Sequence, residues 1–113
     1  MVSEQNILNT QRIRKPDLYL ITIGSGKFKE EKYDLEFASK DAADMKKYFS
    51  KVRMFDDVKQ LHFTDENVTG NLLNDLRTFI EPATENDHII LFYAGHGVLD
   101  EEYNYYLSVF EMD

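Results

Sequence analysis

The sequence predicts an α/β fold, a three-layer sandwich in which helices cover both faces of a mainly parallel sheet. Strand-like segments alternate along the chain with amphipathic helical segments, as in βαβ units with right-handed crossovers. Six consecutive apolar or aromatic residues, Ile89 to Ala94, indicate a strand that is buried on both faces. The 113 residues have room for one domain.

The expected elements follow in order. Residues 1–16 should form a flexible lead-in that Pro16 closes, and residues 17–113 the folded domain. We expect strands at 18–23, 58–63, 88–93 and, as a strand-like final segment, 103–110. The alternating segment 58–63 is typical of an edge strand with one wetter face. Helices are expected from about 35 to 51, capped by Asp34 or Ser39, and from an N-cap at Thr69 to a stop at Pro82.

Charge and composition exclude several classes of function. Twenty-one acids against thirteen bases give a net charge of -8, which repels phosphate backbones, so we expect no nucleic-acid partner and favour basic partners. No apolar run approaches the roughly 20 residues that cross a bilayer, and the amino terminus lacks the plan of a signal peptide. We therefore expect no membrane association and a cytoplasmic location.

Two site types fit poorly. The turn Gly24 to Lys27 follows a strand, but it lacks the first glycine and the final Ser or Thr of a phosphate-binding loop. A small-molecule-binding α/β domain therefore has only this glycine turn in its favour. His62, His88 and His96 lie on different expected elements, without the spacing of metal ligands. We expect neither a metal nor a cofactor, and we interpret His62 as a surface residue and His88 as a strand-start residue.

His96 is the candidate for chemistry because it follows a buried strand and has a glycine on each side. Ligands of open α/β sheets bind at the carboxyl ends of strands, and imidazole suits a general base. The Gly97 amide, unshielded by a side chain, could donate to an oxyanion. The chain contains no cysteine, and none of its serines at 25, 39, 50 and 108 stands in a nucleophile-elbow context.

The segment Phe92 to Gly97, at the end of an apolar strand opened by Asp87, resembles the histidine motif of the caspase-like cysteine peptidases, particularly bacterial caspase homologues and metacaspases. Similar patterns occur at 18–24, at 35–45, at 68–72 and at 105–107, so the likeness covers roughly residues 17–110. The resemblance implies an endopeptidase with a Cys-His dyad, in which His96 activates the thiolate and Gly97 N–H helps to form the oxyanion hole.

The sequence departs from that family by lacking the cysteine, which the resemblance places at the end of the next parallel strand. We therefore expect the first half of the domain, with the nucleophile beyond residue 113 and no activity in this chain alone. The alternative is a non-catalytic, caspase-like module that self-associates and regulates or scaffolds other proteins.

Partner expectations follow from the same resemblance. The substrate is a protein or peptide, and the acids Asp100, Glu101 and Glu102 are compatible with a basic residue at the cut. Without its neighbour, the third strand becomes a sheet edge. We therefore expect self-association through the exposed strand His88 to Tyr93.

Overall fold

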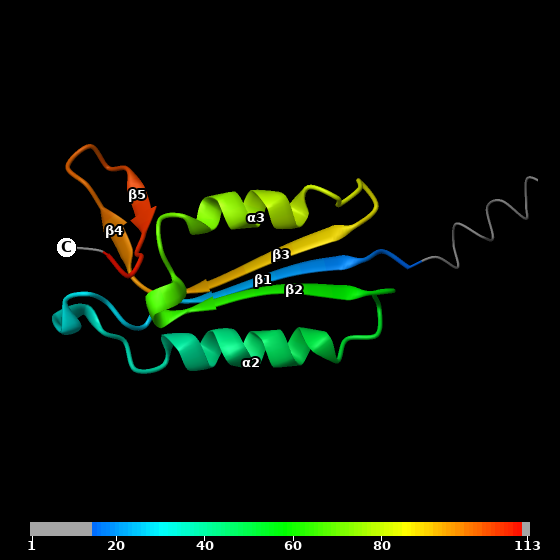
Figure 1. Cartoon of the computed structure of the whole chain (residues 1–113), viewed down its shortest axis with the longest axis horizontal. Helices are drawn as coiled ribbons and strands as arrows, with labels where there is room; N and C mark the ends of the chain where they lie inside the picture. The colour runs from blue at the N-terminus through cyan, green and yellow to red at the C-terminus, as the bar shows by residue number, and fades with distance from the viewer. Residues whose placement is uncertain (1–14, 112–113) are drawn as a thin grey trace, which may run out of the picture.

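A computed structural model describes residues 15–111 and shows a three-layer α/β arrangement. All three strands of the central sheet run parallel in the order β2-β1-β3, with α2 on one face and α3 on the other (Figure 1). The main elements are β1 (Leu18–Gly24), α2 (Ala38–Ser50), β2 (Val58–Thr64), α3 (Leu72–Ile80) and β3 (His88–Ala94). The predicted fold class is confirmed, and each strand of the central sheet lies within one residue of its expected bounds.

The strand buried on both faces is β1. The expectation that the third strand is buried on both faces was wrong, whereas its expected place at the sheet edge is confirmed among the described strands. Every residue of β1 is buried, because β1 lies in the centre of the sheet between the two helices. In β3, by contrast, Ile89 is 50% exposed and Leu91 52% exposed. Within the described residues β3 pairs only with β1 and therefore lies at the edge of the sheet. An apolar run thus predicts a strand, but it does not predict how many faces of that strand are covered.

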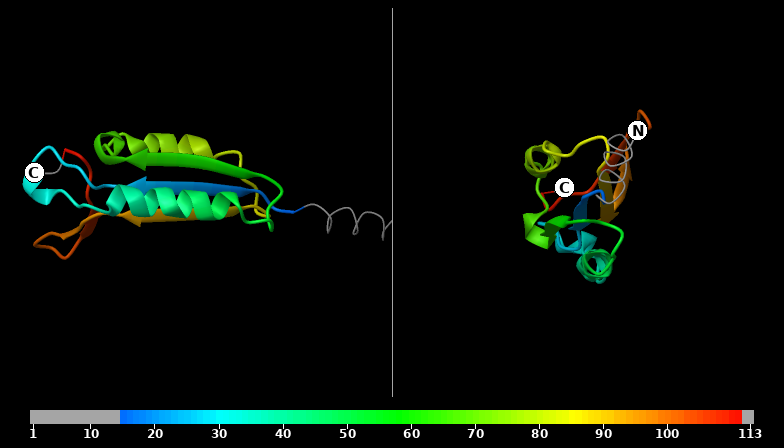
Figure 2. Two further views of the ribbon diagram at one scale, coloured as in Figure 1. Left: turned by 90° about the horizontal axis from the view of Figure 1, so that it is seen from below. Right: turned by 90° about the vertical axis from the view of Figure 1, so that its right-hand side faces the viewer.

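Alternate residues of β1 belong to two apolar clusters, one on each face of the sheet. Leu18 and Leu20 pack with Phe55 on the α2 side, and the partly buried Ile90 of β3 joins them. On the α3 side, Ile21 and Ile23 pack with residues of α3 and β2 and with Val109. The two-residue period of the strands thus divides one sheet between two helix layers. The right-hand, end-on view of Figure 2 shows the two helices on opposite sides of the strands.

Both helices begin later than predicted and neither uses the predicted cap. Phe37 occupies the N-cap position of α2, and Asn71 that of α3, without a side-chain hydrogen bond. The Asp34 carboxylate instead accepts from Phe28 N–H at 2.9 Å, which holds the loop after β1. Thr69 contributes only its carbonyl, to Leu72 N–H at 3.1 Å. The second helix ends at Ile80, before Pro82 as expected.

The expected final strand is shorter and belongs to a separate antiparallel hairpin. Gly97–Leu99 forms β4 and Tyr105–Leu107 forms β5, with Leu99 opposite Tyr105. No strand was predicted at 97–99, because a three-residue strand has too little pattern to detect. The remaining elements are two 3-10 turns, η1 at Glu31–Tyr33 and η2 at Asp65–Asn67.

The expected lead-in lies almost entirely outside the described residues, which begin at Lys15. Lys15 Nζ donates to Arg53 O at 3.1 Å, and Pro16 O accepts from Asp56 N–H at 2.9 Å. Among the helices of residues 15–111, none is long and apolar enough to cross a membrane.

Candidate active site at the carboxyl end of the sheet

His96 lies where β3 gives way to the β4-β5 hairpin. The strand ends at Ala94, Gly95 makes the turn, and β4 begins at Gly97. Figure 1 shows the loop after β1 and the hairpin at this same end of the sheet, which is the carboxyl end of all three parallel strands. The position agrees with the sequence expectation, and it is where open α/β sheets bind ligands.

The imidazole ring of His96 packs against the loop after β1. His96 Nε2 lies 2.7 Å from the backbone oxygen of Tyr33. The ring centroids of Phe28 and Tyr33 lie 5.5 Å and 6.3 Å from that of the imidazole. These contacts were not predicted from the sequence, in which the only signal was an aromatic residue near each end of this loop.

The Tyr33 carbonyl determines which nitrogen of His96 carries the proton. A backbone carbonyl can only accept, so the hydrogen is on Nε2 and Nε2–H is the donor. In the neutral ring Nδ1 then has a free lone pair, and no hydrogen bond within residues 15–111 engages it. The chain therefore presents a histidine with one nitrogen fixed and the other available as a base.

The hairpin ladder leaves the amide of Gly97 free. Ser108 N–H donates to His96 O at 2.9 Å, and Asp100 N–H donates to Asn104 O at 3.0 Å. Hydrogen-bonded pairs alternate in an antiparallel ladder, so Gly97 belongs to a non-hydrogen-bonded pair and its N–H points away from β5. An added Cβ at Gly97 would overlap the end of the Tyr105 ring, so this ring covers one side of the glycine.

The structure keeps the three histidines apart. His88 is exposed at the start of β3, at the other end of the sheet from His96, with its ring 5.5 Å from that of Phe55. His62 is partly buried rather than on the surface, because its Nδ1 lies 2.6 Å from the hydroxyl of the buried Thr22. Burial lowers the pKa of His62 below its ordinary value, and the charge of Lys46 lowers it further.

No group of three or more His, Asp and Glu side chains within the described ranges could hold a metal ion. The expected acids near His96 form the hairpin turn instead. Asp100 accepts hydrogen bonds from Glu102 N–H, from Asn104 and from Tyr106 Oη. These bonds lower the pKa of Asp100, and the bond from Asn104 N–H has the largest effect. Glu101 and Glu102 are exposed in the same turn.

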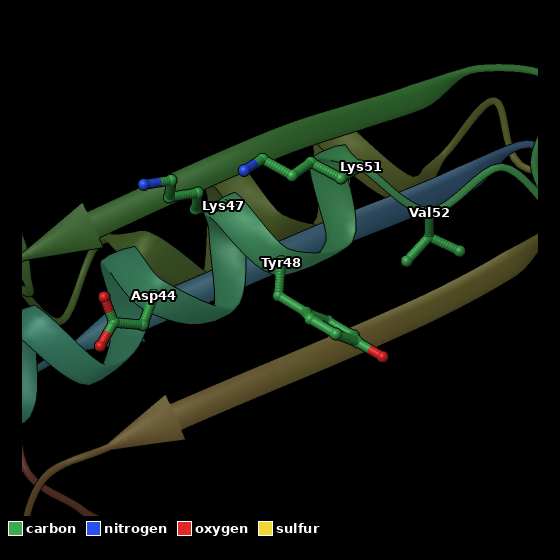
Figure 3. Close-up of a pocket in the computed structure, with 5 residues that line it drawn as sticks. All are labelled: Asp44, Lys47, Tyr48, Lys51 and Val52. Atoms are coloured by element: carbon green, nitrogen blue, oxygen red, sulfur yellow. The ribbon is translucent and has the colours of Figure 1, made fainter.

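Two cavities lie near the sheet, and neither includes the His96 side chain. One, of about 270 Å³, lies between α3, β3 and the segment after β5, and it is lined mainly by apolar side chains. The other is an open groove on α2 (Figure 3), where the Tyr48 ring points toward β3 while Lys47 and Lys51 point toward β2. Neither groove presents converging polar groups for a cofactor.

Comparison with known proteins gives one significant match. A family model described as the caspase domain matches residues 19–112, which is most of the chain. Searches of curated proteins and of solved structures gave no significant match.

Proposed function

Because this chain belongs to the caspase-domain family of cysteine peptidases, we propose that it supplies the histidine half of the active site of an endopeptidase. In this proposal His96 is the general base of a Cys-His dyad. The observation that carries it is the 2.7 Å contact between His96 Nε2 and Tyr33 O, which leaves Nδ1 as the basic nitrogen. These 113 residues contain no cysteine, so the nucleophile must come from outside them.

The proposed reaction begins with transfer of the thiol proton to Nδ1 of His96. The thiolate attacks the carbonyl carbon of the scissile peptide bond, and the charge that develops on the oxygen is stabilised by Gly97 N–H. The imidazolium then gives its proton to the leaving amine, and water hydrolyses the thioester. Support for the role of Gly97 comes from the free direction of its N–H in the hairpin ladder.

The substrate is a protein or peptide, as the family implies. We place a basic residue at the cut on the ground of the net charge of -8, which attracts basic chains. Asp100 contributes little to this preference, since its carboxylate is occupied within the turn. Glu101 and Glu102 are the exposed acids of the hairpin.

A second candidate function is that of an interaction module, and the edge of β3 favours it. Within the described part of the chain, β3 has no neighbour on its outer side, and its exposed Ile89 and Leu91 are apolar. Such an edge is a template for another strand. We propose that two copies pair through His88 to Tyr93 when no other strand covers this edge.

The peptidase proposal is tested by thiol-dependent cleavage in the full-length protein that carries these residues. Fluorogenic peptides with Arg or with Asp before the cut are the substrates. His96→Asn should lower kcat/KM by about 10²–10⁴-fold, the usual contribution of a general base, and iodoacetamide should abolish cleavage. His88→Asn is the matched control, since His88 lies at the opposite end of the strand and should leave the rate unchanged. Equal losses in both variants, or activity that survives alkylation, would contradict the assignment.

A further inference from the structure

Three hydroxyl groups lie close together beside the backbone of His96. Ser25, at 0% exposure, and Ser108, at 3% exposure, are among the most buried polar residues of the described chain. Tyr93 Oη lies 2.7 Å from Ser108 Oγ, and it donates to Ser108 O at 2.8 Å. Ser25 Oγ donates to the same carbonyl at 3.2 Å. We call Ser25, Tyr93 and Ser108 the hydroxyl cluster.

The cluster changes how His96 pairs with the strand opposite. In a regular antiparallel pair His96 N–H would donate to the carbonyl of Ser108. Here it donates to the side-chain oxygen, Ser108 Oγ, at 3.0 Å, while Ser108 N–H donates to His96 O at 2.9 Å. The Ser108 carbonyl is thereby left to accept from Tyr93 and Ser25. Ser108 Oγ–H in turn can donate to Tyr93 Oη, so each hydroxyl proton has an acceptor.

The geometry around Gly95 allows the tyrosine to reach back. A Cβ added to Gly95 would lie 2.7 Å from Tyr93 Cζ and 2.9 Å from Ser25 Cβ, so any side chain there would displace the cluster. Ser25 after β1 and Tyr93 of β3 therefore converge on Ser108, which in turn is hydrogen-bonded to the backbone of His96. The ring of the same residue is fixed from the other side by Tyr33 O.

We propose that Ser108 and Tyr93 are positioning residues for His96. They hold its backbone where Nε2 reaches the Tyr33 carbonyl, and they thereby keep the proton off Nδ1. The importance of this role for catalysis rests on the proposed function. The position of the His96 ring can be measured in this chain whether or not that function is correct. No contact with substrate is involved, and neither residue touches the imidazole ring.

The test uses nitrogen-15 spectra of the histidine rings and amide exchange in the 113-residue chain. The unaltered chain should show His96 in the Nε2–H tautomer and a slowly exchanging His96 amide. Ser108→Ala removes the acceptor of that amide, so exchange should accelerate about tenfold or more, and the ring should populate both tautomers. Tyr93→Phe keeps the ring in the apolar cluster around Ile21 and Ile23, removes only the hydroxyl, and should act in the same direction.

Two comparisons separate positioning from general loss of structure. Ser25→Ala also deletes a buried serine hydroxyl, but this hydroxyl makes no bond to His96, so exchange at His96 should change by less than about threefold. His62, whose Nδ1 is hydrogen-bonded to the Thr22 hydroxyl, should be unaffected in every variant. A variant that merely loosens the fold would instead move both histidines.

The proposal is overturned if Ser108→Ala folds and leaves the tautomer and amide exchange of His96 unchanged. If Ser108→Ala does not fold, Tyr93→Phe decides by the same two measurements. None of these readouts depends on peptide cleavage, so a failure of the peptidase proposal and a failure of the positioning proposal give different results.

Discussion

Replacement of Leu91 by Lys should abolish self-association through the β3 edge. Ile89 is 50% exposed and Leu91 is 52% exposed. Complete burial of such a side chain gives about 1.5–3 kcal/mol, so each exposed half is worth about 0.8–1.5 kcal/mol. Two side chains in each of two copies then give about 3–6 kcal/mol. Association itself costs at least about 4 kcal/mol, so backbone hydrogen bonds between the edges must supply the surplus.

These magnitudes predict a weak dimer that one charge per copy is enough to dissociate. Leu91→Lys removes half of the apolar contribution, about 1.5–3 kcal/mol, and adds a positive charge to each of the two paired edges. The dissociation constant should rise by about ten- to a hundredfold or more. Sedimentation velocity at tens of micromolar, a typical range for such association, should show mass above the monomer for the unaltered chain and a monomer for Leu91→Lys.

Leu99→Lys is the matched control, because Leu99 is a leucine of similar exposure, 56%, and lies in the hairpin instead of the sheet edge. This variant should associate like the unaltered chain. A clean monomer for the unaltered chain would refute the reasoning, as would dissociation by Leu99→Lys but not by Leu91→Lys.

Three further predictions concern stability. Gly24→Ala puts a Cβ within 2.5 Å of the α2 backbone and should lower the free energy of unfolding in urea by about 1–3 kcal/mol. Gly97→Ala meets only the end of an exposed tyrosine ring and should lower it by less than about 1 kcal/mol. Equal losses would contradict the packing described. Burial lowers the pKa of His62 below 6.5, so the unfolding free energy should be highest above that pH and fall as the pH drops through the folded value; His62→Gln should remove this dependence between about pH 7.5 and about pH 5. Hydrogen bonds lower the pKa of Asp100, and the bond from Asn104 N–H has the largest effect, so the turn is stabilised above the ordinary pKa of an aspartate and weakened in acid. Asp100→Asn should accelerate amide exchange at Asn104 at neutral pH. Unchanged exchange would show that the carboxylate does not hold the turn.

The sequence was sufficient to predict the three strands of the central sheet and the position of His96 after the third. Leu18–Gly24 and His88–Ala94 are compact apolar runs that end at glycine, a pattern with few alternatives. Burial was harder to predict, because it depends on neighbours in space. The place of β3 at the sheet edge was expected, but the exposure of Ile89 and Leu91 contradicts the expectation of a strand buried on both faces.

Other contacts were beyond prediction because they carry no residue signature. The partner of His96 is the backbone carbonyl of Tyr33, 63 positions earlier, and any residue type offers that oxygen. Asp34 looked like a helix cap, but its carboxylate meets Phe28 N–H first, since the loop after β1 closes on itself. Ser108 looked like an unremarkable serine, and only the hairpin register brings its hydroxyl to His96 N–H.

The central claim is that His96 serves a cysteine that these 113 residues do not contain. The most direct measurement is to determine the reading frame past Asp113 and to replace the cysteine that ends the next predicted strand. We predict such a cysteine within about one further βαβ length, roughly 30 or more residues, and equal loss of peptide cleavage on changing it to Ser or changing His96 to Asn. A frame without that cysteine, or cleavage that survives its replacement, would contradict the peptidase account and favour the interaction module.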